Sequence, residues 1–199
     1  MELEITKDAK QQRNLVLGAE MFEQDNQQAL DLYLQNKISV KGLDSMARLW
    51  KNYPTDYAPL VDLQRINHIA FAATNIPRRY AAIVSKGGFE ALDTVPANQK
   101  TWIAPLPIAY DAELPGYKNM MTMMGGHGSP NMPKAQAIKD ATMAYLFCSI
   151  LCRAVYSFIT MAVTTPKTMM VLYGIVTCKT RFENCNRYYS KPKRYYAPA

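Results

Sequence analysis

Pro77 separates two apolar segments, and it constrains the fold of this chain more than any other residue. Proline fixes φ and lacks a backbone N–H, so it is tolerated in the first turn of a helix and breaks a helix interior. Before it, apolar residues recur every three or four positions, which is typical of one helical face. These residues are Leu60, Leu63, Ile66, Ile69, Ala70 and Ala73. We therefore expect a helix that ends near Asn75 and a second helix that begins at the proline.

The second helix would begin with two arginines. Arg78 and Arg79 follow Pro77, Tyr80 lies on the apolar face, and Gly87 with Gly88 ends the helix. A helix N-terminus has unpaired N–H groups and the positive end of the helix dipole, so added cations there favour an anionic partner. The alternative is an ordinary amphipathic hairpin whose arginines are solvated.

The positive charge is concentrated at the C-terminal end. The chain carries a net charge of +7, but residues 1–132 have 13 basic and 14 acidic residues, whereas residues 133–199 have 10 and 2. This asymmetry favours a polyanion such as nucleic acid, with an anionic membrane surface as the alternative. In residues 179–199 the cations alternate with tyrosines, a combination typical of single-strand binding through phosphates and stacked bases. Docking to a neighbouring subunit is the other reading of this tail.

The pattern predicts a mostly α-helical chain: a two-lobed helical bundle with an extended proline-rich connection and flexible N- and C-terminal arms. Residues 1–94 would form the N-terminal lobe, with an irregular arm at residues 1–6 and helices near 8–22, 27–35 and 40–53. Residues 95–132 would be the connection, because six prolines fall between residues 95 and 133. Residues 133–178 would be an apolar helical region, and 179–199 the tail. The methionine-rich run at 120–124 is either an adaptable surface or a helical turn.

The helix expected from Pro133 to Val163 is the candidate membrane span. Arg153 interrupts its apolar part and leaves segments shorter than the roughly 20 residues that a span needs, so a buried helix is preferred. The four cysteines lie far in sequence from both histidines, so we expect buried free thiols and no metal site. Residues 1–8 are charged and no apolar segment follows, which predicts no secretory signal. No nucleophile, phosphate-loop or dinucleotide motif is present, so we expect no enzyme and no cofactor.

Residues 40–92 resemble part of a viral protein family. The residues that carry the resemblance are Gly42, Leu43, Asp44, Leu49, Tyr53, Asp62, the run 69–72, Asn75, Pro77, Arg78, Arg79, Ser85, Lys86 and Gly88. Their order and spacing resemble the N-terminal lobe of phlebovirus-type nucleoproteins, which are related in fold to the coat proteins of flexible filamentous viruses. The resemblance implies a helical protein that polymerises along single-stranded RNA.

The sequence thus predicts a nucleoprotein or coat protein that binds the RNA backbone with little base readout and assembles with copies of itself, in the virion or host cytoplasm. The alternative is a peripheral membrane-associated interaction protein that uses the basic tail. No small-molecule substrate is expected. The expected RNA-binding residues are Arg65, Arg78, Arg79, Lys86, Arg153, Arg181, Arg187, Tyr188, Tyr189, Lys191, Lys193 and Arg194.

Overall fold

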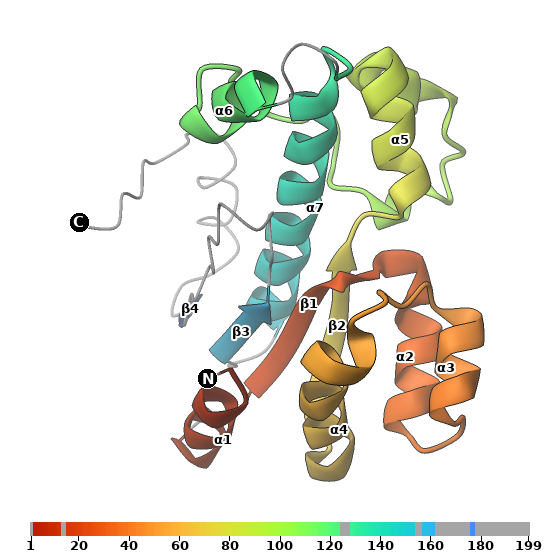
Figure 1. The fold of residues 1–199 in the computed structure, drawn as a ribbon, viewed down its shortest axis with the longest axis vertical. Helices are drawn as coiled ribbons and strands as arrows, with labels where there is room; N and C mark the ends of the chain where they lie inside the picture. The colour runs from red at the N-terminus through yellow and green to blue at the C-terminus, as the bar shows by residue number, and fades with distance from the viewer. Residues whose placement is uncertain (1, 13–14, 124–127, 154–156, 162–175, 178–199) are drawn as a thin grey trace.

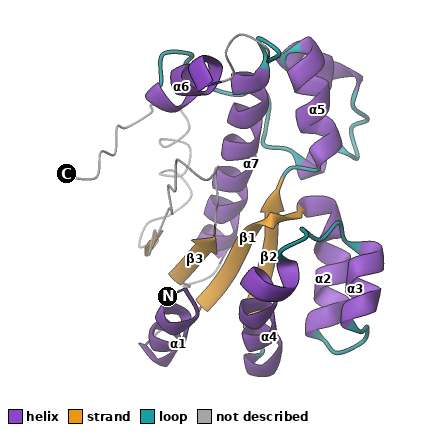
Figure 2. Ribbon diagram, in the orientation of Figure 1, coloured by secondary structure: helices purple, strands orange, loops and turns teal. Residues whose placement is uncertain are grey.

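A computed structural model describes residues 2–12, 15–123, 128–153, 157–161 and 176–177 (Figure 1). Helices predominate among these residues, which confirms the mostly helical prediction, but a sheet that was not predicted runs through the molecule (Figure 2). The helices are α1 (Glu2–Gln12), α2 (Gln27–Leu34), α3 (Val40–Met46), α4 (Ala58–Asn67), α5 (Arg78–Gly87), α6 (Pro115–Met123) and α7 (Met132–Arg153). Shorter helical turns are η1 (Gln24–Asn26), η2 (Tyr53–Tyr57), η3 (Phe89–Thr94) and η4 (Lys100–Trp102).

The sheet has the strand order β2-β1-β3-β4. Strand β1 (Leu15–Glu23) pairs in parallel with β2 (Ala70–Asn75) on one side and β3 (Ser157–Met161) on the other. The short strand β4 (Val176–Thr177) is antiparallel to β3. All nine residues of β1 are buried. A parallel strand covered on both faces can be apolar without alternation, which explains the sequence of this strand.

Three predicted helical or irregular segments were wrong. Residues 15–22 form β1, because burial on both faces removes the alternation that identifies a strand, and the remaining apolar spacing imitates a helix. The helix expected to continue through Ala73 ends at Asn67, where His68 adopts the left-handed conformation (φ 53°), and the chain continues as β2. Residues 2–6 of the expected N-terminal arm are part of α1.

Other boundaries also differ. The helix expected over 40–53 is α3 alone, and Pro54 lies in η2. The helix expected over 133–163 ends at Arg153, and β3 follows after residues 154–156. In the rest of the apolar helical region expected to reach residue 178, residues 162–175 and 178 lie outside the described residues, and Val176–Thr177 form β4. In contrast, α2 and α5 confirm the predicted segments closely, and Gly88 ends α5 at φ 76° as expected.

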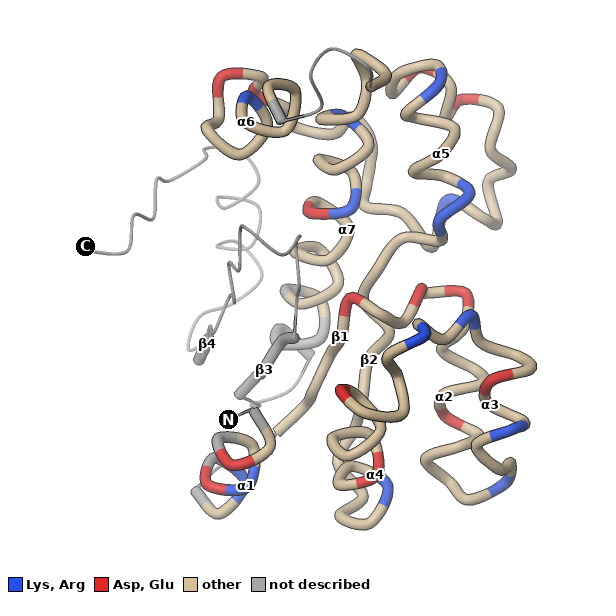
Figure 3. The backbone as a smooth tube through the Cα atoms, in the orientation of Figure 1, with Lys and Arg blue, Asp and Glu red and all other residues tan. Residues whose placement is uncertain are grey.

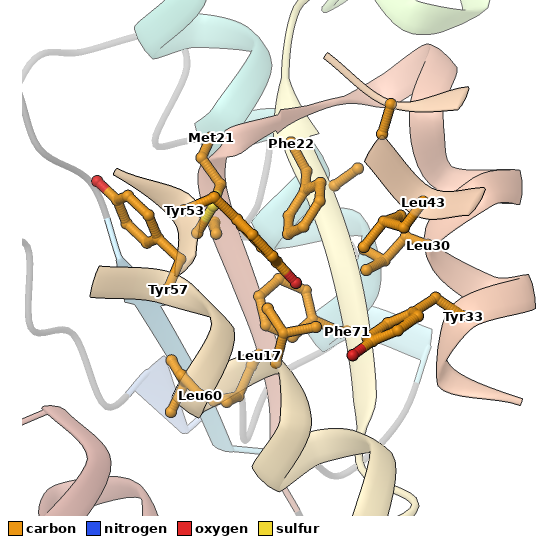
Figure 4. Packing of buried hydrophobic residues seen from close by; sticks show 14 of the residues in the cluster. Leu17, Met21, Phe22, Leu30, Tyr33, Leu43, Tyr53, Tyr57, Leu60 and Phe71 are labelled. Atoms are coloured by element: carbon orange, nitrogen blue, oxygen red, sulfur yellow. The ribbon is translucent and has the colours of Figure 1, made fainter. Parts of the chain in front are cut away.

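Two hydrophobic clusters lie at opposite ends of the described fold. The first packs α2, α3, η2 and α4 around β1 and β2. At its centre Phe22 meets Tyr53 and Phe71 edge-on, with ring centroids 6.2 and 5.7 Å apart (Figure 4). The second cluster joins α5, η3 and the N-terminal half of α7 through Tyr80, Leu92 and Ile138. Helix α7 contacts both β2 and α5 and so connects the two clusters (Figure 1).

The side chain of Gln27 covers part of the outer edge of β2. Its Nε2 donates to the Phe71 carbonyl (2.9 Å), and its Oε1 accepts from the Ala73 N–H (2.6 Å). In the described part of the chain β2 has one strand neighbour, β1. The glutamine therefore supplies the donor and acceptor that a further strand would offer at this position.

Candidate functional site

A cleft of about 390 Å³ lies between the segment 105–117 and α7. This volume is within the roughly 300–1,000 Å³ that is common for small-molecule sites. Most of the lining is apolar and comes from Pro105, Pro107, Ile108, Ala109, Leu114, Ala137, Ala141 and Ala144. The polar lining residues are Tyr110, Asp111, Tyr117 and Asp140.

Helix α7 forms one wall because of where its small residues fall. Ala137, Ala141 and Ala144 are spaced by four and three positions, so they share one helical face, and Asp140 lies on the same face. Alanine side chains leave room beside the helix. The segment opposite starts from a fixed point, because the Ala104 N–H donates to the buried Thr142 Oγ1 of α7 (3.2 Å). The proline-rich segment is thus fixed to the helix at this point.

Tyr117, Asp140 and Gln136 form a hydrogen-bonded chain at the cleft. The Tyr117 hydroxyl donates to Asp140 Oδ2 (2.9 Å), and Gln136 Nε2, one turn earlier on α7, donates to Asp140 Oδ1 (2.9 Å). Burial raises the pKa of Asp140, and the two hydrogen bonds and nearby Lys139 act against that shift. The pKa of Tyr117 is also raised, first by burial and then by the charge and hydrogen bond of Asp140.

Aromatic rings continue from Tyr117 towards α5. The Tyr110 ring lies 5.5 Å from that of Tyr117 at a tilt of 35°, and Phe89 meets Tyr110 edge-on at 5.8 Å. Lys134 Nζ lies 6.0 Å from the Phe89 ring centre. Such ring contacts hold both tyrosines of the cleft in fixed orientations. The cleft therefore combines an apolar surface with two ordered phenol groups.

A second polar group of residues lies where β1 and β2 end (Figure 3). Arg48 donates to Glu23 Oε2 (2.8 Å) and to Asp25 Oδ1 (2.5 Å), and Arg79 donates to Asp25 Oδ2 (2.6 Å). Glu23 Oε2 also accepts from the backbone N–H of Arg78 (2.9 Å), so it caps α5. The carboxyl ends of parallel strands are a common ligand site. Here the charged groups bind one another and thereby connect the end of β1 to α5 and to the residues after α3.

Five of the residues expected to bind RNA lie in the part of the chain that the structure describes. Arg79 is paired with Asp25 and lies over the rings of Tyr80 and Trp102, and Arg78 and Lys86 lie at opposite ends of α5. Arg65 pairs with Asp62 (3.4 Å) and lies over Tyr33. Arg153 is the last residue of α7. The remaining candidates lie outside the described residues: Arg181, Arg187, Tyr188, Tyr189, Lys191, Lys193 and Arg194.

Sequence reasoning missed the cleft residues Tyr110, Tyr117 and Asp140. The one signal in the sequence is the pair of apolar residues Leu106 and Ile108 among the prolines, which is typical of a segment that packs against the fold. In the ranges that the structure describes, no group of three or more His, Cys, Asp and Glu could hold a metal ion. Nor does any helix there have the length and hydropathy to cross a membrane.

Comparison with known protein families matches residues 1–173 to the family described as haem-binding uptake, Tiki superfamily, ChaN. No curated protein and no solved structure shows significant similarity to the chain. The match covers most of the chain and overturns the resemblance to viral nucleoproteins over residues 40–92. The predicted filament protein, its partners single-stranded RNA and further copies of itself, and the membrane-associated alternative were therefore wrong. A short pattern of apolar and basic positions was misleading, because part of it forms a parallel strand.

Proposed function

Because the chain belongs to the haem-binding uptake family ChaN of the Tiki superfamily, we propose that it binds haem in the cleft between residues 105–117 and α7. The observation that carries this proposal is the lining, in which eight apolar residues surround two ordered tyrosines. The proposal keeps the two-lobed organisation expected from the sequence and assigns haem to the lobe that contains the second hydrophobic cluster.

The lining fits the macrocycle and its iron. Apolar walls remove a flat aromatic ring system from water, and the alanines of α7 leave room beside the helix. Bound haem supplies an iron whose axial position accepts a protein ligand, and tyrosine is one of the side chains used for this purpose. Tyr110 and Tyr117 are the candidates in this cleft. The described lining contains no lysine or arginine, so the fit does not extend to the haem propionates.

The proposed role is binding and transfer of haem. Apolar burial and a phenol ligand hold haem without any further reactive group, so this role needs no catalytic residue. The expectation that the chain is not an enzyme stays a prediction, as does the expected location in the virion or host cytoplasm.

Haem titration of the purified full chain tests the proposal. We expect a saturable change in the Soret absorption of ferric haem, with one haem per chain. Tyr110→Phe combined with Tyr117→Phe should weaken binding by about 10-fold or more, because the axial ligand is lost. Tyr57→Phe, in the first hydrophobic cluster, is the matched control and should leave the titration unchanged. Wild-type affinity and an unaltered spectrum in the double variant would exclude this cleft as the haem site.

A further inference from the structure

The charged residues that line the cleft between residues 105–117 and α7 are both acidic. They are Asp111 and Asp140, and no lysine or arginine lies among the lining residues that the structure describes. Asp111 is exposed at the rim of the cleft. Glu113, beside the lining residue Leu114, adds a third acidic side chain that is 74% exposed. A ligand group that enters the cleft therefore passes acidic side chains at its rim.

Two lysines near the cleft are already in contact with other side chains. Lys118 forms an ion pair with Glu113, so the two charges cancel as seen from the cleft. Lys134 Nζ lies 6.0 Å from the centre of the Phe89 ring. Phe89 contacts Tyr110 and not Tyr117 in the row of rings, so Lys134 lies at the end of that row. Neither lysine adds an unpaired positive charge to the lining.

Lys139 is next to Asp140 in sequence but leaves α7 on another side. It lies two positions from Ala137 and two from Ala141, which both line the cleft. Side chains two positions apart on a helix do not share a face. Its charge acts on Asp140 at a distance, but its ammonium group is not part of the lining.

We propose that the cleft recognises the macrocycle and iron of haem but not its carboxylates, so that haem binds with both propionates directed to solvent. This inference rests on the proposed function and defines its ligand class as flat iron porphyrins with or without free carboxylates. A propionate inside the cleft would lose its water without gaining a cation, and it would approach the Asp111 carboxylate. Asp111 is thereby assigned as a specificity-determining residue.

A cleft of this kind differs from one that pairs propionates with cations in two measurable ways. The dimethyl ester of haem, which has no carboxylates, should bind at least as tightly as haem. Added salt should raise the affinity for haem relative to the ester, because it screens repulsion between exposed charges. The screening length falls from roughly 30 Å at 0.01 M salt to roughly 3 Å at 1 M. Pairing with cations would reverse both effects.

Parallel titrations of the full chain with ferric haem and ferric haem dimethyl ester, in one detergent buffer, test the inference. The Soret band gives both affinities, and their ratio removes the greater apolarity of the ester from comparisons between variants. Asp111→Asn removes the charge but keeps an oxygen for the Glu113 N–H. It should raise the ratio of haem to ester affinity by about 2- to 5-fold, as for exposed charge pairs. Asp44→Asn, exposed on α3 in the first cluster's lobe, is the matched control and should leave the ratio unchanged.

Glu113→Gln is a second, independent variant. It removes one acidic group and frees Lys118, so it should also raise the ratio of haem to ester affinity. If wild type binds neither porphyrin, the proposed function fails. If wild type binds haem more tightly than the ester and salt lowers the ratio, the propionates are recognised. That result, or a ratio that neither Asp111→Asn nor Glu113→Gln changes, overturns the inference and leaves the proposed function standing.

Discussion

Glu23 shows how one buried side chain can fix three segments. One carboxylate oxygen accepts two bonds from Arg48 and one from the backbone N–H of Arg78. The side chain is 9% exposed, so these bonds are partly shielded from water. The carboxylate thereby connects the end of β1 to the second residue after α3 and to the first turn of α5.

Glu23→Gln is expected to lower the free energy of unfolding by about 1–3 kcal/mol, because hydrogen bonds to a charged acceptor are replaced by weaker neutral ones. Urea unfolding measures the change. Glu4→Gln removes a similar charge from an exposed pair with Lys7 and should cost less than about 1 kcal/mol. Equal losses in both variants would show that burial of Glu23 adds nothing.

Asp140 should make stability depend on pH. Its pKa in the folded protein is above its ordinary value of 3.8, so the folded state holds a proton that the unfolded state has released. The free energy of unfolding therefore falls as pH rises from about 4 through the raised pKa. Above that pKa, Asp140 is ionised in both the folded and the unfolded state, and it adds no further dependence on pH. Relative to Asp140→Asn, wild type should lose at most about 1.4 kcal/mol per pH unit in this window. Urea unfolding of both proteins from pH 4 to 8 measures this, and a rising difference would contradict it.

Among the elements, those with one buried face were predictable and those with two were not. The segment that forms α5 has an apolar stripe, a proline before it and glycines after it, and these local signals agree. The nine residues of β1 are all buried, so their apolar character carries no period from which a strand could be identified. The same holds for β2, where five of six residues are buried.

The cleft could not be predicted from the sequence, because its polar residues come from separate elements. Tyr110 lies in the connecting segment, Tyr117 in α6 and Asp140 in α7, so no local spacing relates them. From the sequence alone, Asp140 is most simply interpreted as a solvated residue of the helix. Only the folded structure brings the Tyr117 hydroxyl within hydrogen-bond distance of it. Tertiary packing, and the match to a family of haem-binding proteins, were needed to recognise the site.

His68 ends α4 in the left-handed region (φ 53°, ψ 37°) and is exposed. The left-handed conformation costs a non-glycine residue about 1–2 kcal/mol in the folded state. Glycine avoids this cost, but its greater freedom stabilises the unfolded chain by roughly 0.4–1 kcal/mol, which offsets part of the gain. His68→Gly should therefore stabilise the protein by about 0.5–1 kcal/mol in urea unfolding. Asn36, at φ 59°, is the matched control, because asparagine tolerates this region and Asn36→Gly should gain less. A loss of stability in His68→Gly would mean that the histidine side chain contributes to the fold.

At the scale of the whole molecule, α7 makes one cooperative unit of two hydrophobic clusters. It contacts β2 beside the first cluster and α5 within the second (Figure 1). The Asp25 carboxylate adds a link, since it pairs with Arg48 near the first cluster and with Arg79 near the second. We therefore expect loss of packing in one cluster to reach the other through the contacts of α7 with β2 and α5.

Phe22→Ala removes a fully buried side chain from the first cluster, and Leu92→Ala removes one from the second. We expect losses of about 3–5 and 2–5 kcal/mol, with a single unfolding transition in each variant. Far-UV circular dichroism and tryptophan fluorescence should give coincident curves, since Trp50 packs on the first cluster and Trp102 on the second. Two separated transitions would show that the clusters unfold independently.

The contacts of Gln27 with β2 bear on how copies of this protein behave at high concentration. An uncovered strand edge attracts another chain, and in the described part of the fold β2 lies at such an edge. One amide side chain occupies the carbonyl of Phe71 and the N–H of Ala73, the two groups that an incoming backbone would first engage. The glutamine is therefore expected to oppose pairing of this edge with the strand of a neighbouring molecule. We therefore expect solubility at high concentration to depend in part on a residue outside the cleft between residues 105–117 and α7.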